Sequence, residues 1–180
     1  ALTDNQKAML IQSSRDQRKK LLDPLTGCWS EIGFIGLLTR TLKDVVAGDA
    51  CAVLCGIRIV NHDDFAVTDE QGGETIKAML ISQFLRQRLP ANAVLCRMPA
   101  GRGCILFAAR DKDVLREQLA SFLQEKDAAP VAGMVFPQKM NLVSTCLKLQ
   151  DDEANMAPEL LFEKVMGQLA EGQAVSSVLR

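Results

Sequence analysis

The sequence predicts a single α/β domain, of the α+β type, in which helices flank a central mixed β-sheet and a further helix leads at the N-terminus. Apolar residues recur at helical spacing in several segments that contain no proline. Short apolar runs bounded by glycine or proline lie between these segments, as is typical of buried strands. The 180 residues, of which 48% are hydrophobic and 24% charged, suffice for one core of ordinary size.

Five helices are expected from the spacing. The first ends before Asp23-Pro24, because the residue that precedes a proline is disfavoured in a helix. Ser30 and Asp111 suit the N-caps of the second and fourth helices, and Pro158 suits the first turn of the fifth. The expected ranges are 1–22, 30–47, 74–89, 112–125 and 158–170. The residues expected to face inward are Ile32, Ile35, Leu38, Leu42, Val45, Ile76, Met79, Leu80, Phe84, Leu85, Val114, Leu115, Leu119 and Phe122.

The central strand is predicted from the nearly continuous apolar run between Cys51 and Val60, which only Gly56 and Arg58 interrupt. A connection rich in glycine and proline at residues 99–103 predicts a hairpin between the two runs that flank it. The remaining expected strands are residues 93–98, 104–109, 131–136 and 140–149. The polar stretch 61–73 predicts a loop.

Composition argues against several classes of partner. A net charge of −1, without tyrosine and with one tryptophan, provides neither the positive surface nor the stacking platform that nucleic acid requires. The apolar runs are too short to span a membrane, so we expect no membrane contact from this chain. No signal peptide opens the sequence, and a cytoplasmic location is expected. The missing initial methionine suggests a piece of a longer protein, which could itself be membrane-anchored.

The cysteines do not predict a metal site or a disulfide framework. The six cysteines include no CxxC pair, and His62 is the only histidine. A chain of this size can form its core without disulfides. We therefore expect buried free thiols, a solvated His62, no bound metal and no cofactor.

A short motif indicates a family. The polar first helix leads into Asp23-Pro24-Leu25-Thr26-Gly27, one helix before the central strand and two helices before the hairpin. This arrangement resembles the GGDEF domain of diguanylate cyclases, whose entry reads D-x-L-T-G after a signalling helix. The resemblance implies a nucleotidyl-cyclase palm-like fold. It also implies a signalling or linker helix at 1–22, a GGDEF-like domain at 23–175 and a tail at 176–180.

The functional positions of that family are replaced. Counting without gaps, the family's metal-binding Asp on the central strand falls on Gly56 and the second Asp on Arg58. In the hairpin signature, the metal-binding acid falls on Gly101 and the next acid on Arg102. Mg²⁺ requires hard oxygen ligands, usually carboxylates, and glycine supplies none from a side chain. The resemblance therefore implies a degenerate domain without catalytic residues.

Other family positions are altered as well. The guanine-reading Asn corresponds to Asp64, and the guanine-reading Asp corresponds to Gly73 or Glu74. Leu169 and Gln173 stand where the family has its phosphate-clamping cations. The inhibitory R-x-x-D motif corresponds to residues 90–93, which read Pro-Ala-Asn-Ala.

Three functions remain open at this stage. The first is an inactive domain that acts as a regulatory or protein-interaction module in bacterial cyclic di-GMP signalling, with a protein partner or a second copy held through the N-terminal helix. The second is a nucleotide or cyclic di-GMP receptor without turnover that uses Arg58, Arg97 and Arg102, with Asp64 as a further candidate, because arginine binds phosphate bidentately. Ion pairing with the acidic loop would instead occupy those arginines. The third is a different enzyme on the same fold, for which no catalytic set is found.

Overall fold

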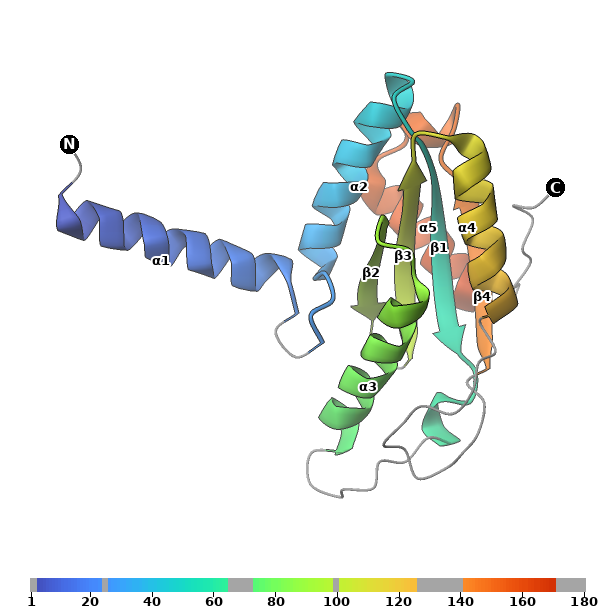
Figure 1. Ribbon diagram of the computed structural model, residues 1–180, viewed down its shortest axis with the longest axis horizontal. Coiled ribbons are helices and arrows are strands. Elements are labelled where there is room, and N and C mark those ends of the chain that lie inside the picture. The colour runs from blue at the N-terminus through green and yellow to red at the C-terminus, as the bar shows by residue number, and fades with distance from the viewer. Residues whose placement is uncertain (1–2, 24–25, 65–72, 99–100, 126–140, 171–180) are drawn as a thin grey trace.

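The computed structural model describes residues 3–23, 26–64, 73–98, 101–125 and 141–170. Its centre is a four-stranded sheet in the order β2-β3-β1-β4 (Figure 1). The strands are β1 (Cys51–Ile59), β2 (Ala93–Met98), β3 (Arg102–Ala109) and β4 (Leu142–Lys148). The predicted hairpin is confirmed, since β2 and β3 pair antiparallel from Ala93–Phe107 to Met98–Arg102.

The expectation of a mixed sheet was wrong. Every strand pairing among the described residues is antiparallel, and a parallel contact is limited to the isolated bridge between Trp29 and Cys96. The continuous apolar run of β1 suggested a parallel sheet because such runs mark strands that are buried on both faces. Here helices cover both faces of an antiparallel sheet, which produces the same sequence pattern.

Helices form a layer on each side of the sheet. The α2 helix (Glu31–Val46) and α5 (Pro158–Ala170) cover one face, and their apolar side chains share a cluster with Leu54 and Leu106. The α3 helix (Gly73–Arg88) and α4 (Lys112–Glu125) cover the other face, around Ile57 and Ile105. The first helix, α1 (Asp4–Leu21), extends away from this body (Figure 1). Two short 3₁₀ turns complete the described part, η1 (His62–Asp64) and η2 (Glu153–Asn155).

Side chains of β1 alternate between the two layers. Val53, Cys55 and Ile57 pack with α3 and α4, whereas Ala52 and Leu54 pack with α2 and α5. This alternation follows from the two-residue period of a strand. It also places Gly56 and Arg58 on the face that α2 and α5 cover, which matters for the site described below.

The expected helix caps are confirmed, but three inward positions were wrong. The side chain of Ser30 accepts a hydrogen bond from Gly33 N at 3.1 Å, and that of Asp111 accepts one from Asp113 N at 2.8 Å. Ile32, Met79 and Val114, predicted to face inward, are 73%, 44% and 43% exposed. In each of these helices the apolar residues extend around more of the helix than the roughly 100° stripe that packs on the sheet. Some of the apolar side chains therefore remain exposed.

Some predictions concern residues outside the described ranges. The expected strand at 131–136 is one of them, together with most of the loop at 61–73 and the whole tail at 176–180. The expected strand at 140–149 corresponds to β4.

Candidate functional site

The sheet register brings Arg58 and Arg102 together. They are direct partners in the antiparallel pairing of β1 with β3, beside the hairpin turn. The turn is tied to β1 by a hydrogen bond from Ile59 N to the carbonyl of Gly101 at 2.9 Å. Like charges directly opposite each other in a sheet repel, so an anion beside this pair would be stabilised.

Arg58 carries an unusual polar atom. Its Nε is buried and makes no hydrogen bond to the described residues. A buried donor without a partner costs about 1–3 kcal/mol, more for a charged group. Arg102, by contrast, does have an interaction partner. The Arg58 guanidinium is therefore the group here with spare capacity to bind an anion.

Gly56 faces a helix rather than open space. A Cβ placed on Gly56 would lie 2.8 Å from Cγ1 of Val165 and 3.6 Å from Cδ2 of Leu169. Both of these α5 residues are fully buried. A carboxylate at this position would enter an apolar layer without a partner. The sheet–helix packing thus excludes the side chain that the resemblance places here.

Gly101 is closed in a similar way by His62. Gly101 has φ +71°, and a Cβ there would lie 2.8 Å from the His62 ring. The side chain of His62 is only 19% exposed and lies 3.4 Å from Asp63. The expectation of a solvated His62 was therefore wrong, because Gly101 has no side chain and so leaves room for the ring. An acidic side chain at this position would have to displace the ring.

Arg97 does not join the other two arginines. It follows Leu95, which belongs to the α3–α4 side of the core, whereas Arg58 and Arg102 lie on the α2–α5 side. Its guanidinium contacts the carboxylate of Asp23 at 3.4 Å, and the hydroxyl of Thr26 donates to that same carboxylate at 2.8 Å. Arg97 therefore contacts the first residue of the Asp23-to-Gly27 turn rather than the other two arginines.

The remaining predicted positions fall in three kinds of place. Asp64 ends η1, but its side chain is outside the description. Leu169, at a position to which the resemblance gives a phosphate-clamping cation, is buried in the apolar core. The Pro90–Ala93 segment forms the turn into β2, with Ala93 N donating to the carbonyl of Pro90. Gln173 lies outside the described residues.

The cysteines are free, as expected, and five of the six are buried. Two cross-strand pairs arise that sequence reasoning missed, Cys55 with Cys146 and Cys96 with Cys104. Burial raises the pKa of Cys96 to about 12, with Glu31 and Cys28 adding to the shift. Burial also raises the pKa values of Cys55 and Cys104 well above the ordinary value. These thiols are core groups rather than nucleophiles.

Metal and membrane features are also absent from the described part of the chain. No group of three or more His, Cys, Asp or Glu side chains there is arranged to hold a metal ion. None of the helices there combines the length and the apolar character that a membrane-spanning segment requires.

Comparison of the sequence alone finds nothing: neither a protein-family model nor a curated protein matches it. Comparison of the structure does find proteins of similar fold. A sensory box/GGDEF family protein from Caulobacter crescentus superposes with a TM-score of 0.64 at 18% identity, over 84% of this chain and 96% of that one. The chain has the GGDEF-domain fold. The resemblance that the Asp23-to-Gly27 motif indicated is thereby confirmed for the fold.

Two further GGDEF structures match a larger share of this chain. The coiled coil and GGDEF domain of DgcB from Caulobacter crescentus, solved with c-di-GMP, has a TM-score of 0.63 at 10% identity, over 93% of this chain and 87% of that one. The diguanylate cyclase SiaD from Pseudomonas aeruginosa, solved with its activator SiaC, has a TM-score of 0.63 at 12% identity, over 94% of this chain and 65% of that one.

Proposed function

We propose that this chain is a GGDEF-like domain that does not synthesise cyclic di-GMP and that acts as a regulatory or protein-interaction module in cyclic di-GMP signalling inside the cell. The observation that carries the proposal is the pair Gly56 and Gly101. Neither position offers a carboxylate, and Val165 and His62 occupy the space that each would need. Phosphoryl transfer depends on metal-assisted charge neutralisation, which these positions do not supply.

The test is direct. The purified chain is incubated with GTP and Mg²⁺, and cyclic di-GMP is quantified against an active diguanylate cyclase. We expect no product above a protein-free blank. Magnesium-dependent formation of cyclic di-GMP would overturn the proposal.

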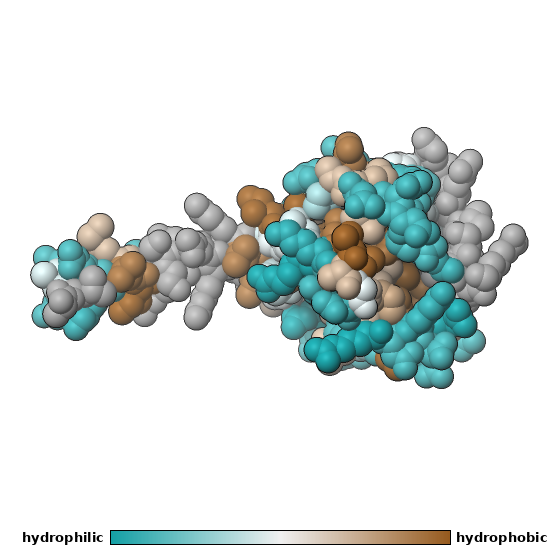
Figure 2. Space-filling model, turned by 90° about the horizontal axis from the view of Figure 1, so that it is seen from above, coloured by the Kyte–Doolittle hydropathy of each residue, from teal (hydrophilic) through white to brown (hydrophobic). Residues whose placement is uncertain are grey.

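The α1 helix supports an interaction role. Its described side chains include the exposed apolar residues Met9, Leu10 and Ile11, at 72%, 57% and 54% exposure. Leu21, the last residue of the helix, and Leu22, which follows it, are 38% and 39% exposed. Figure 2 shows apolar side chains on the arm that extends from the body. Apolar residues in this number on a projecting helix favour contact with a protein partner or a second copy. The complex of SiaD with SiaC is a protein complex of a chain with this fold.

Self-association and partner binding are separated by one measurement. Light scattering coupled to size exclusion gives the mass of the full chain and of a Leu10→Glu, Ile11→Glu variant. Self-association through α1 predicts a dimer that the double substitution converts to a monomer. If the parent chain is a monomer, the apolar residues of α1 would instead bind a different protein.

A second function is favoured by one observation, the buried Nε of Arg58, which makes no hydrogen bond within the described part of the chain. Together with Arg102 it could bind the phosphates of a nucleotide or of cyclic di-GMP without turnover. Titration calorimetry with each ligand tests this receptor function. Binding that Arg58→Gln weakens at least tenfold, and that Arg97→Gln leaves unchanged, would support it. Absence of heat with both ligands would exclude it and leave the interaction module.

A further inference from the structure

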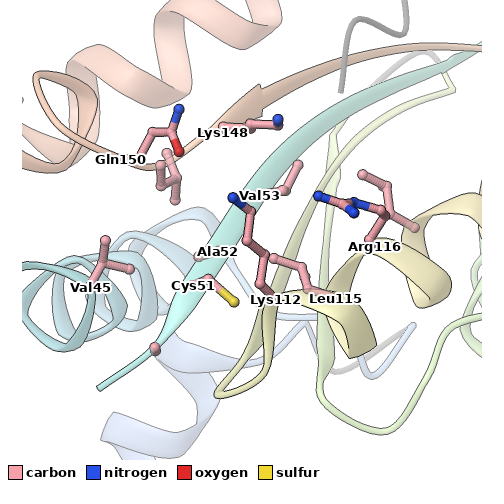
Figure 3. Close-up of a pocket in the computed structure, with 12 residues that line it drawn as sticks. Val45, Cys51, Ala52, Val53, Lys112, Leu115, Arg116, Lys148 and Gln150 are labelled. Atoms are coloured by element: carbon pink, nitrogen blue, oxygen red, sulfur yellow. The ribbon is translucent and has the colours of Figure 1, made fainter. Parts of the chain in front are cut away.

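A cavity opens at the end of the sheet opposite the hairpin. It has a volume of about 160 Å³ and lies where β1 begins, between α4 and the end of β4 (Figure 3). Its walls are apolar, with Val53, Leu115, Leu119 and Leu149 all buried in the two core clusters. Figure 2 looks onto this end and shows apolar side chains enclosed by hydrophilic ones on the body. The cavity thus offers an apolar interior with a polar rim.

Three cations stand on that rim. Lys112 and Arg116 lie four residues apart on α4, and therefore on one face of the helix. Lys148 comes from the last position of β4, where it pairs with Val53. Figure 3 shows the charged ends of all three side chains around the same opening. The sequence separates Lys148 from the other two, so only the fold brings the set together.

Few anions in the described part of the chain compensate this charge. Arg116 contacts the carboxylate of Asp113 only at 3.9 Å, with both side chains largely exposed. Neither Lys112 nor Lys148 makes an ion pair with the described residues. Asp111 also acts on the thiol of Cys51, which lines the cavity, and its carboxylate keeps its negative charge while it accepts the Asp113 N–H as a helix cap. Gathering three like charges is unfavourable unless an anion joins them.

The size and charge of the cavity specify a class of ligand. A cavity of roughly 150 Å³ in a protein interior is large enough for benzene. An aromatic ring or a short alkyl group would therefore fill the apolar interior. A phosphate monoester carries about −1.5 to −2 charges at pH 7, which matches three cations better than a carboxylate does. We propose that this cavity binds a small phosphate monoester, with its apolar group between α4 and β1 and its phosphate among Lys112, Arg116 and Lys148.

Phenyl phosphate is the probe that tests the proposal. It is titrated into the full chain by calorimetry, beside three control ligands. Inorganic phosphate lacks the aromatic ring, phenol lacks the negative charge, and benzoate has the ring but only one negative charge. We expect phenyl phosphate to bind at least tenfold more tightly than each of the three. Equal affinity for inorganic phosphate or for benzoate would overturn the proposed pairing of ring and dianion.

Variants locate the binding. Arg116→Gln and Lys148→Gln should each weaken phenyl phosphate at least threefold, with unchanged melting temperatures. Lys164→Gln on α5 removes an exposed cation away from the cavity and should leave the affinity unchanged. Amide resonances of Val53 and Leu115 should shift on titration. Equal weakening by Lys164→Gln, or shifts confined to Arg58 and Arg102, would overturn the proposal without touching the proposed function.

Discussion

The two ends of β1 have opposite characters. At the hairpin end, Ile59 is hydrogen-bonded to the turn and His62 packs on Gly101, while Val165 fills the space over Gly56. At the other end, Cys51 and Val53 border an open cavity with three cations on its rim. In one domain, then, the place where the GGDEF resemblance puts the chemistry is packed with side chains, and an end without a family motif is open and charged. The fold alone therefore does not determine where on this chain a ligand could bind.

The largest expected effect restores a carboxylate at the packed end. Gly56→Asp places an unpartnered acid against Val165 and should destabilise the domain by more than about 3 kcal/mol. Urea unfolding checks this, with Gly36→Asp as the matched control, because a Cβ on Gly36 meets nothing within 4 Å. Similar midpoints for the two variants would show that the packed end has room after all.

Alkaline titration compares thiols from the two ends. The raised pKa of Cys96 means that the unfolded chain loses this proton first, so stability present below about pH 9 falls as the pH rises toward 12. For such a thiol the free energy of unfolding falls by about 1.4 kcal/mol per pH unit. The sequence contains no tyrosine, whose titration in the same pH range would obscure this decline.

The measurement is the urea midpoint at several pH values between 8 and about 11. Cys96→Ala should flatten the decline, whereas Cys51→Ala, at the partly exposed end, should flatten it less. The pKa of Cys51 is also raised by burial, but its side chain is half-buried rather than enclosed. An equal effect of both substitutions would contradict the difference between the two ends.

Glycine conformation gives a smaller effect with an internal control. Gly48 and Gly101 both have positive φ, at 81° and 71°, but only Gly101 has a ring against it. Gly48→Ala should cost about 1 kcal/mol from backbone strain alone. Gly101→Ala should cost roughly 1 kcal/mol more, because the His62 ring must move.

A double-mutant cycle isolates that ring. In a His62→Ala background the cost of Gly101→Ala should return to the value for Gly48→Ala, as measured by chemical unfolding. If Gly101→Ala costs as much stability in the His62→Ala background as in the parent chain, the His62 ring is not what closes the position of Gly101.

The smallest effect concerns Arg97. Its pair with Asp23 is partly exposed at 3.4 Å, so Arg97→Gln should cost about 0.5 kcal/mol or less, and less still at high salt. Thermal unfolding at low and high ionic strength is the measurement. A loss above about 2 kcal/mol would mean that the Asp23-to-Gly27 turn depends on this arginine far more than its exposure indicates.

Local patterns in the sequence determined most elements of the fold. Ser30 and Asp111 predicted helix starts because capping is a contact between near neighbours in the chain. Gly56 and Gly101 stand where the GGDEF resemblance puts metal-binding acids, and the sequence shows directly that neither position has a side chain. The Asp23-to-Gly27 motif likewise indicated the fold that the similar solved structures confirm.

Tertiary structure alone decided the strand order, the closure of Gly56 and Gly101, and the cavity. Ile32 and Phe34 are both apolar, yet only the packing of α2 on the sheet selects Phe34 for burial. Lys112 and Arg116 show helical spacing, but Lys148 joins them only through the pairing of β4 with β1. Contacts between residues far apart in the chain depend on how whole elements pack, and a local pattern does not carry that information.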